Sequence, residues 1–280
     1  MGNNVPSGNK MPVAQQEDQE EDNNTTTEPP FTKGSRVVFC FGDSLTAGYT
    51  RETMFHGKFH PYAIQLENTL KQEKDVVQDE IFVLPVGGSG ITALELSKST
   101  NLNSTINTDV CRQKYMGLRA ALQYCQDHGG ICIGVIIMCG TNDLADIGTS
   151  TESILTSICK LHTICHDEFH IKTITMSIPP NSTSTKRIDL QSTPRMIKNY
   201  ITKWRRINES LQTWTNETTA TKSKTMFFDV SNCVPYFPES KYWESDGLHM
   251  TKEGYNYLGQ TLAPIVIDHF FSNITDFPNS

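Results

Sequence analysis

A serine, an aspartate and a histidine in this chain have the side chains and spacing of a nucleophile and its activating pair. Ser44 lies in Gly-Asp-Ser-Leu, directly after the apolar run 36–41, and Asp246 and His249 stand three residues apart near the other end of the chain. A serine hydroxyl becomes a nucleophile when an imidazole accepts its proton and a carboxylate orients the imidazole. We therefore predict a catalytic triad of Ser44, His249 and Asp246.

Two further segments carry groups that could stabilise a developing oxyanion. Asn142 lies in Gly-Thr-Asn-Asp, which follows the apolar residues 136–139, and its side-chain amide can donate hydrogen bonds. Gly87, Gly88 and Gly90 form a glycine-rich turn after the run 80–86, where backbone N–H groups can approach a ligand closely. We expect one of these glycines, Asn142 and the Ser44 amide to form an oxyanion hole.

Apolar or β-branched runs and helical patterns alternate along the chain, and these elements must position the reactive residues. The expected strands are 36–41, 80–86, 132–139, 171–177 and 225–230. The expected helices are 62–74, 92–99, 111–127, 151–167, 195–213 and 252–271. This alternation predicts an α/β protein, with one parallel sheet of about five strands and helices on both faces. Ligands bind beyond the carboxyl ends of such strands, where the glycine turn, Ser44 and Asn142 lie.

These motifs, in this order, resemble the SGNH or GDSL hydrolase superfamily of esterases and lipases over roughly residues 36–270. The four residues that give this superfamily its name would be Ser44, Gly90, Asn142 and His249. The resemblance implies a three-layer, flavodoxin-like α/β/α fold, an acyl-enzyme mechanism, and no metal or organic cofactor. It also assigns the oxyanion amide to Gly90. One departure is Pro85, where members often have Asn before the glycine turn, so Gly87 and Gly88 stay open as alternatives.

The expected substrate is a small-molecule carboxylic ester, with acetyl and other short-chain acyl esters favoured. An acyl-thioesterase or a carbohydrate O-deacetylase would use the same triad, so both remain alternatives. The segment Phe59-His60-Pro61-Tyr62 and the irregular stretch 179–194 are expected to line the pocket. Asp43 and Asp143 are expected to have structural roles, bonding to nearby backbone.

Composition indicates where the chain acts and what it does not bind. The net charge is −7, and residues 1–32 contain six acidic residues against Lys10 alone. We predict a disordered acidic tail over 1–33 and a single hydrolase domain over 34–280. No basic stripe offsets phosphate charge, which disfavours nucleic acid as a partner. The longest apolar run, 131–139, is shorter than the about 20 residues that span a bilayer. Without a secretory signal at the start, we expect a cytoplasmic protein.

Three other interpretations compete with a hydrolase. Gly88 to Ala93 match G-x-G-x-x-A, a pattern typical of NAD(P) binding. That pattern requires a following strand that ends in an acidic residue. The acidic residue here, Asp109, follows a polar stretch without strand character. His162, His166 and His170 share one helical face and could bind a metal, although His170 is expected beyond the last helical turn. A non-catalytic binding module is the third, although it usually lacks a triad residue.

Overall fold

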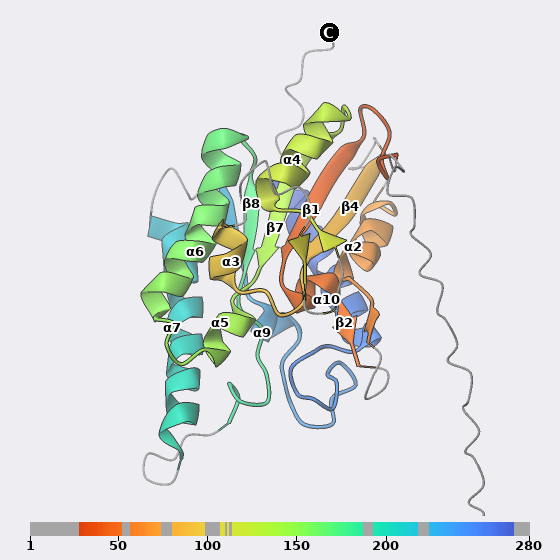
Figure 1. Cartoon of the computed structure of the whole chain (residues 1–280). Helices are drawn as coiled ribbons and strands as arrows, with labels where there is room; N and C mark the ends of the chain where they lie inside the picture. Colours follow the sequence, from red (N-terminus) through yellow and green to blue (C-terminus); the bar gives the residue numbers. More distant parts are fainter. Residues whose placement is uncertain are drawn as a thin grey trace, which may run out of the picture.

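The computed structural model describes residues 28–51, 57–73, 80–98, 107–109, 111, 114–186, 193–217 and 224–271. At its centre is a five-stranded parallel sheet of spatial order β4-β1-β7-β8-β9 (Figure 1). These strands are β1 (Arg36–Gly42), β4 (Ile81–Gly87), β7 (Ile131–Met138), β8 (Thr173–Met176) and β9 (Thr225–Phe228). Of these five strands, the second along the chain, β4, lies at one edge and pairs with the first, β1. The strands β7, β8 and β9 follow on the other side of β1 in chain order. This is the flavodoxin-like topology, so the predicted fold class is confirmed.

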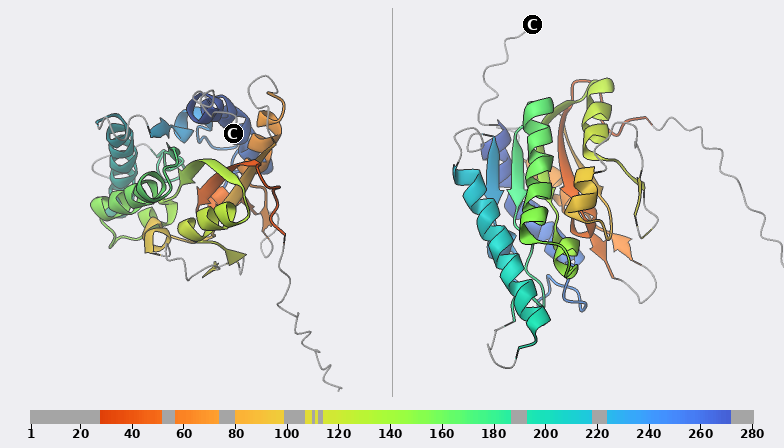
Figure 2. Two further views of the ribbon diagram at one scale, coloured as in Figure 1. Left: turned by 90° about the horizontal axis from the view of Figure 1, so that it is seen from above. Right: turned by 60° about the vertical axis from the view of Figure 1, so that its left-hand side comes forward.

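Helices cover both faces of the sheet (Figures 1 and 2). One face packs against α2 (Tyr62–Leu70) and α10 (Lys252–Val266), and the other against α3 (Ala93–Lys98), α4 (Leu118–Asp127), α6 (Thr151–Thr163) and α7 (Arg195–Glu217). Alternate residues of a strand serve the two cores: Val38 and Cys40 face α2 and α10, while Val37 and Phe39 face the other layer. Because both faces are buried, the strands consist chiefly of apolar and β-branched residues.

Short elements connect this framework at the two ends of the sheet. They are the helices α1 (Ser44–Ala47), α5 (Thr141–Ala145) and α9 (Val230–Cys233), the hairpin strands β2 (Tyr49–Thr50) and β3 (Lys58–Phe59), and the π-helical turns η1 (Ile164–Glu168) and η2 (Ile267–Phe271). The turns η1 and η2 continue α6 and α10 to about the ends predicted for those helices. Within the described ranges, no helix is long and apolar enough to cross a membrane.

The prediction was wrong between β4 and β7. The helix expected over 111–127 begins only at Leu118, because Gly117 has an extended backbone and precedes the first helical turn. Before it, β6 (Lys114–Tyr115) pairs with β5 (Asn107–Thr108) as a two-stranded antiparallel sheet. The stretch expected to lack strand character therefore contains a short strand. This strand lies outside the main sheet.

The predicted tail also ends earlier than residue 33. Phe31 is only 3% exposed, and its ring packs edge-on against Tyr124 of α4 with 6.3 Å between the ring centroids. The N–H of Gly34 donates to the carbonyl of Gly129 at 2.8 Å. Residues 28–33 are thus part of the folded domain. Residues 1–27 lie outside the described part, and the disorder expected of them stays a prediction.

Candidate active site

Ser44 is held at the carboxyl edge of the sheet by a sharp turn between β1 and α1. It is the first residue of α1, and Asp43 caps this helix by accepting a hydrogen bond from the Leu45 N–H at 3.0 Å. Thr46 of the same turn donates its hydroxyl to the carbonyl of Met138, the last residue of the neighbouring strand β7. The first N–H groups of a helix have no partner within it. The Ser44 amide is therefore a candidate donor to a ligand.

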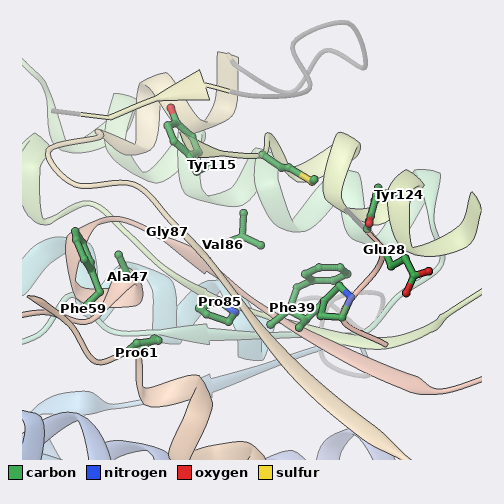
Figure 3. Close-up of a pocket in the computed structure, with 13 residues that line it drawn as sticks. Glu28, Phe39, Ala47, Phe59, Pro61, Pro85, Val86, Gly87, Tyr115 and Tyr124 are labelled. Atoms are coloured by element: carbon green, nitrogen blue, oxygen red, sulfur yellow. The ribbon is translucent and has the colours of Figure 1, made fainter. Parts of the chain in front are cut away.

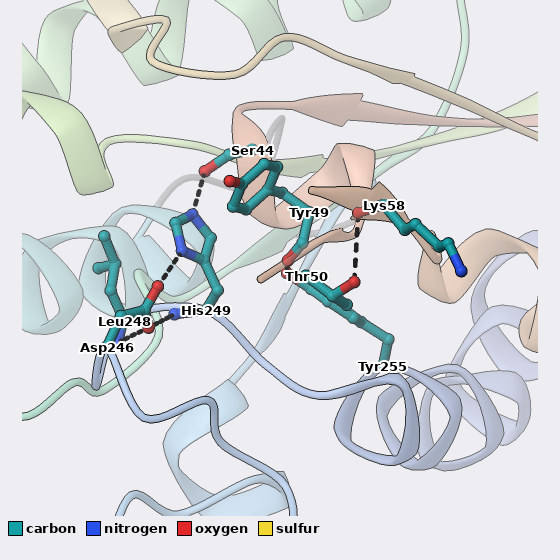
Figure 4. Close-up of polar contacts among 8 residues, drawn as sticks. All are labelled: Ser44, Tyr49, Thr50, Lys58, Asp246, Leu248, His249 and Tyr255. Atoms are coloured by element: carbon teal, nitrogen blue, oxygen red, sulfur yellow. Dashed lines mark hydrogen bonds and ion pairs between the residues drawn. The ribbon is translucent and has the colours of Figure 1, made fainter. Parts of the chain in front are cut away.

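Ser44, His249 and Asp246 form a continuous series of hydrogen bonds (Figure 4). The Ser44 Oγ lies 3.1 Å from His249 Nε2, across a sequence separation of 205 residues. The His249 Nδ1 lies 2.8 Å from Asp246 Oδ2. A carboxylate can only accept a hydrogen bond, so the proton of the neutral imidazole belongs on Nδ1 and leaves Nε2 to accept from the serine hydroxyl.

The loop that carries Asp246 and His249 is ordered by its own backbone. The second oxygen of Asp246 accepts from the N–H groups of Leu248 at 2.8 Å and His249 at 3.0 Å. Gly247 has φ +67°, and a Cβ there would lie 2.6 Å from the Cβ of Ser182, so glycine is required by conformation and by space. Burial raises the pKa of Asp246, but the hydrogen bonds from His249 and Leu248 outweigh it and bring the pKa to about 2. Asp246 is therefore ionised at neutral pH.

The two predicted oxyanion segments contact one another at the edge of the sheet that carries Ser44. The Asn142 side-chain N–H donates to the carbonyl of Ile91 at 2.9 Å, which joins α5 to the glycine turn. An asparagine amide has two donor hydrogens, so a second remains for a ligand. Gly88 donates its N–H to the carbonyl of Gly42, whereas Gly90 is exposed with φ +75°. Among the described residues, the Gly90 N–H has no acceptor, which favours Gly90 over Gly88 and leaves Gly87 as an alternative.

Asp43 and Asp143 bond to backbone, as predicted. Asp43 caps α1, and its pKa is raised to about 6, chiefly by burial and against the hydrogen bond from Leu45. Asp143 accepts from the N–H of Ala93 at 2.7 Å and thereby holds the start of α3 against α5. Burial also raises the pKa of Asp143. The two carboxylates thus support the segments that carry Ser44 and Asn142.

Tyr49 is a further residue at the site, which the sequence did not predict. Its ring lies against the imidazole of His249, with 4.8 Å between the centroids and an angle of 59° between the planes. The other side of the hairpin contributes Phe59, whose ring is 5.8 Å from that of Tyr49, and the hydroxyl of the buried Tyr255 donates to the Tyr49 carbonyl at 2.9 Å (Figure 4). The contact depends on how β2 and β3 fold back onto α10. No spacing in the sequence indicates it.

Of the two segments expected to line the pocket, one lines a cleft and the other packs against the loop of Asp246 and His249. Phe59 and Pro61 line an apolar cleft along β4. The described residues 179–186 instead pack against the acid and base loop, where the Ser182 N–H donates to the Gly247 carbonyl at 2.8 Å. The remainder of the predicted stretch includes residues 187–192, which lie outside the described part.

The residues behind two competing interpretations have other contacts. The Asp109 carboxylate accepts from the N–H of Ser89 at 2.7 Å, so it bonds to the glycine turn itself. His162 and His166 both contact the Thr173 hydroxyl, at 2.8 and 3.0 Å, while His170 is exposed beyond the end of η1, as predicted. Among the described residues, no three His, Cys, Asp or Glu side chains are arranged to hold a metal ion.

A flavodoxin-like sheet with a serine, an imidazole and a carboxylate hydrogen-bonded in series at its carboxyl edge is the arrangement of an α/β serine hydrolase. The family model for GDSL-like lipases and acylhydrolases matches residues 38–262. The chain belongs to this family, and it is a serine hydrolase that acts on esters.

Solved structures share the fold at low sequence identity. Est24, a carbohydrate acetylesterase from Sinorhizobium meliloti, is 19% identical with a TM-score of 0.56, over 83% of this chain and 99% of its own. The inhibitor-bound aryl esterase of M. smegmatis is 18% identical with a TM-score of 0.55, over 84% of this chain and 99% of its own. No curated protein matches the chain. At these identities the likeness concerns the fold alone.

Proposed function

We propose that the protein hydrolyses carboxylic esters through an acyl-enzyme formed on Ser44. The observation that carries the proposal is the hydrogen-bonded series from Ser44 Oγ through His249 to Asp246, with 3.1 and 2.8 Å between the paired atoms. The arrangement supplies a nucleophile, a base within reach of its proton, and an ionised carboxylate behind the base.

In the first half of the reaction, Ser44 Oγ bonds to the ester carbonyl carbon while its proton passes to His249 Nε2. The tetrahedral intermediate then collapses, and the alcohol leaves with that proton. In the second half, water gives its proton to His249 and attacks the acyl group, and the same proton returns to Ser44 as the acid departs. Asp246 holds the Nδ1 proton of His249 and stabilises the charged imidazolium in both halves.

The negative charge on the carbonyl oxygen would be met by three donors. These are the N–H groups of Ser44 and Gly90 and the side-chain amide of Asn142. Fixed donors stabilise the oxyanion because they need not reorient as the charge develops. The bond from Asn142 to the Ile91 carbonyl supports this role, since it ties the amide to the turn that bears Gly90.

Asp246→Asn tests the assignment of the triad. An asparagine can donate to His249 and thus favour the wrong tautomer, so kcat for p-nitrophenyl acetate should fall by about 10⁴-fold. The matched control is Glu244→Gln, which removes a neighbouring carboxyl. Glu244 contacts His249 through its backbone, where its N–H donates to the His249 carbonyl. The proposal fails if Asp246→Asn keeps the turnover of the control while both variants are folded by circular dichroism.

A further inference from the structure

An apolar cleft of about 520 Å³ runs along the free edge of the sheet, beside β4. Figure 3 shows Ala47 and Phe59 at one end, Val86 in the middle, and Glu28 and Tyr124 at the other end. Its walls come from three directions: the hairpin and the start of α2 on one side, β6 and α4 on the other, and β4 as the floor. None of these residues belongs to the proposed triad or oxyanion hole.

The cleft begins at the turn that carries the nucleophile. Ala47 lines it and stands three residues after Ser44 in α1, a spacing that places two side chains on the same helical face. Gly87, at the same end, packs so closely on this turn that a Cβ there would lie 2.4 Å from the Ala47 nitrogen. From Gly87 back to Leu84 the floor extends by three strand residues, about 10 Å at the usual rise.

The floor of the cleft offers little to a polar ligand. Among the described strands, β4 pairs with β1 alone, so its outer edge would ordinarily present backbone N–H groups. At Pro85, the departure from the family pattern noted in the sequence, that donor is missing, and the ring is exposed in the cleft. Leu84, Val86, Tyr115 and Met116 complete an apolar middle section. The lining residue with a charged side chain is Glu28, at the far end from Ser44.

The cleft also lies on a definite side of the reacting centre. His249 must reach the departing alcohol, so the alcohol leaves on the imidazole side. The cleft is separated from the imidazole by two rings in series: Phe59, which lines the cleft, contacts Tyr49, and Tyr49 contacts His249. A chain that enters the cleft from Ser44 therefore belongs to the acyl part of the ester.

We propose that this cleft binds the acyl chain of the substrate, and that the preferred esters carry an unbranched apolar chain longer than acetate. This inference rests on the proposed function and amends the expectation of short acyl groups. Each methylene of the acyl chain that moves from water into the cleft should raise kcat/KM about fourfold.

The test is the chain-length profile of kcat/KM, measured with p-nitrophenyl acetate, butyrate, octanoate and decanoate below their micelle concentrations. The wild type should prefer octanoate to acetate by well over tenfold. Val86→Trp places a large ring in the middle of the cleft, so it should lower the ratio of octanoate to acetate at least tenfold and leave acetate hydrolysis unchanged. Ile64→Trp is the matched control, because Ile64 is 56% exposed on α2 and does not line the cleft. Its profile should follow that of the wild type.

A second arm uses the acetates of butanol and octanol to separate the acyl part from the alcohol part. Val86→Trp should leave their hydrolysis unchanged; selective loss of octyl acetate would overturn the acyl assignment. A wild-type profile that is flat or falls beyond acetate, or a Val86→Trp profile equal to that of the control, would overturn the proposal. In these cases acetate hydrolysis and covalent labelling of Ser44 would persist, whereas failure of the proposed function would abolish both.

Discussion

Asn142 is the proposed oxyanion donor whose contribution can be isolated by one substitution. Asn142→Ala removes the amide that would face the oxyanion and should lower kcat by roughly a hundredfold or more. It also removes the bond to the Ile91 carbonyl, so the free energy of unfolding should fall by about 1 kcal/mol. Asn199→Ala, at an exposed asparagine of α7, is the control. Unchanged turnover in a folded Asn142→Ala protein would remove Asn142 from the mechanism.

Tyr49 is expected to act on the reaction through the imidazole that it contacts. Its ring lies against His249, and an aromatic ring beside a cation stabilises the charge that develops during proton transfer. Tyr49→Leu should lower kcat about fivefold with little change in KM. Tyr49→Phe keeps the ring and should restore the rate. A loss in Tyr49→Phe as large as in Tyr49→Leu would contradict a role for the ring.

The candidate site residues that occur in sequence motifs could be predicted from the sequence. Ser44, Asn142, Asp246 and His249 each follow a strand or precede the last helix, and the structure gathers them at one edge of the sheet. Their catalytic roles stay predictions. Tyr49 could not be predicted, because its contact with His249 requires β2, β3 and α10 to pack together.

At the scale of elements, two buried histidines join α6 and its π-helical extension η1 to β8 and β9. His162 Nδ1 and His166 Nε2 both lie within hydrogen-bonding distance of the Thr173 hydroxyl, and His166 also reaches Thr225. Burial, with the neighbouring His166, lowers the pKa of His162 to about 3. Burial, with Lys224 and His269 nearby, lowers that of His166 to about 4. Both imidazoles are therefore neutral at neutral pH.

This contact should make the fold sensitive to acid. Below the ordinary histidine pKa of about 6.5, His162 binds a proton in the unfolded chain but stays neutral in the folded protein. The free energy of unfolding therefore falls as the pH drops toward the pKa of His162 in the folded protein. The loss from His162 amounts to about 2 kcal/mol by about pH 5. Urea unfolding of His162→Leu should show this part of the pH dependence removed, while His128→Leu, at an exposed histidine, should retain it. Equal pH dependence in wild type and His162→Leu would contradict the account.

The long elements of the fold were predictable, and the short ones were not. Each strand of the main sheet is a run of chiefly apolar or β-branched residues, because helices cover both faces of the sheet. β5 and β6 have two residues each and depend on pairing with one another, so no periodicity distinguishes them from a loop. The burial of Phe31 likewise depends on where α4 lies, and composition placed it in the tail.

The fold as a whole brings together groups from both ends of the chain. The site lies where the strand order reverses, with β1 between β4 and β7, and segments after these three strands supply Ser44, Gly90 and Asn142. The loop before α10 brings His249 to the same edge. The apolar cleft beside β4 begins at Ala47, so the proposed acyl-binding surface adjoins the turn that carries Ser44.

Covalent labelling with a fluorophosphonate probe tests whether Ser44 is the nucleophile, because the probe reacts with a serine only when that serine is an activated nucleophile. The wild-type protein should be labelled on Ser44, as located by peptide mass spectrometry, and Ser44→Ala should not be labelled. Asn199→Ala, outside the site, should be labelled like the wild type. Labelling that persists in Ser44→Ala, or a folded wild-type protein that is never labelled, would contradict the assignment of Ser44 as the nucleophile.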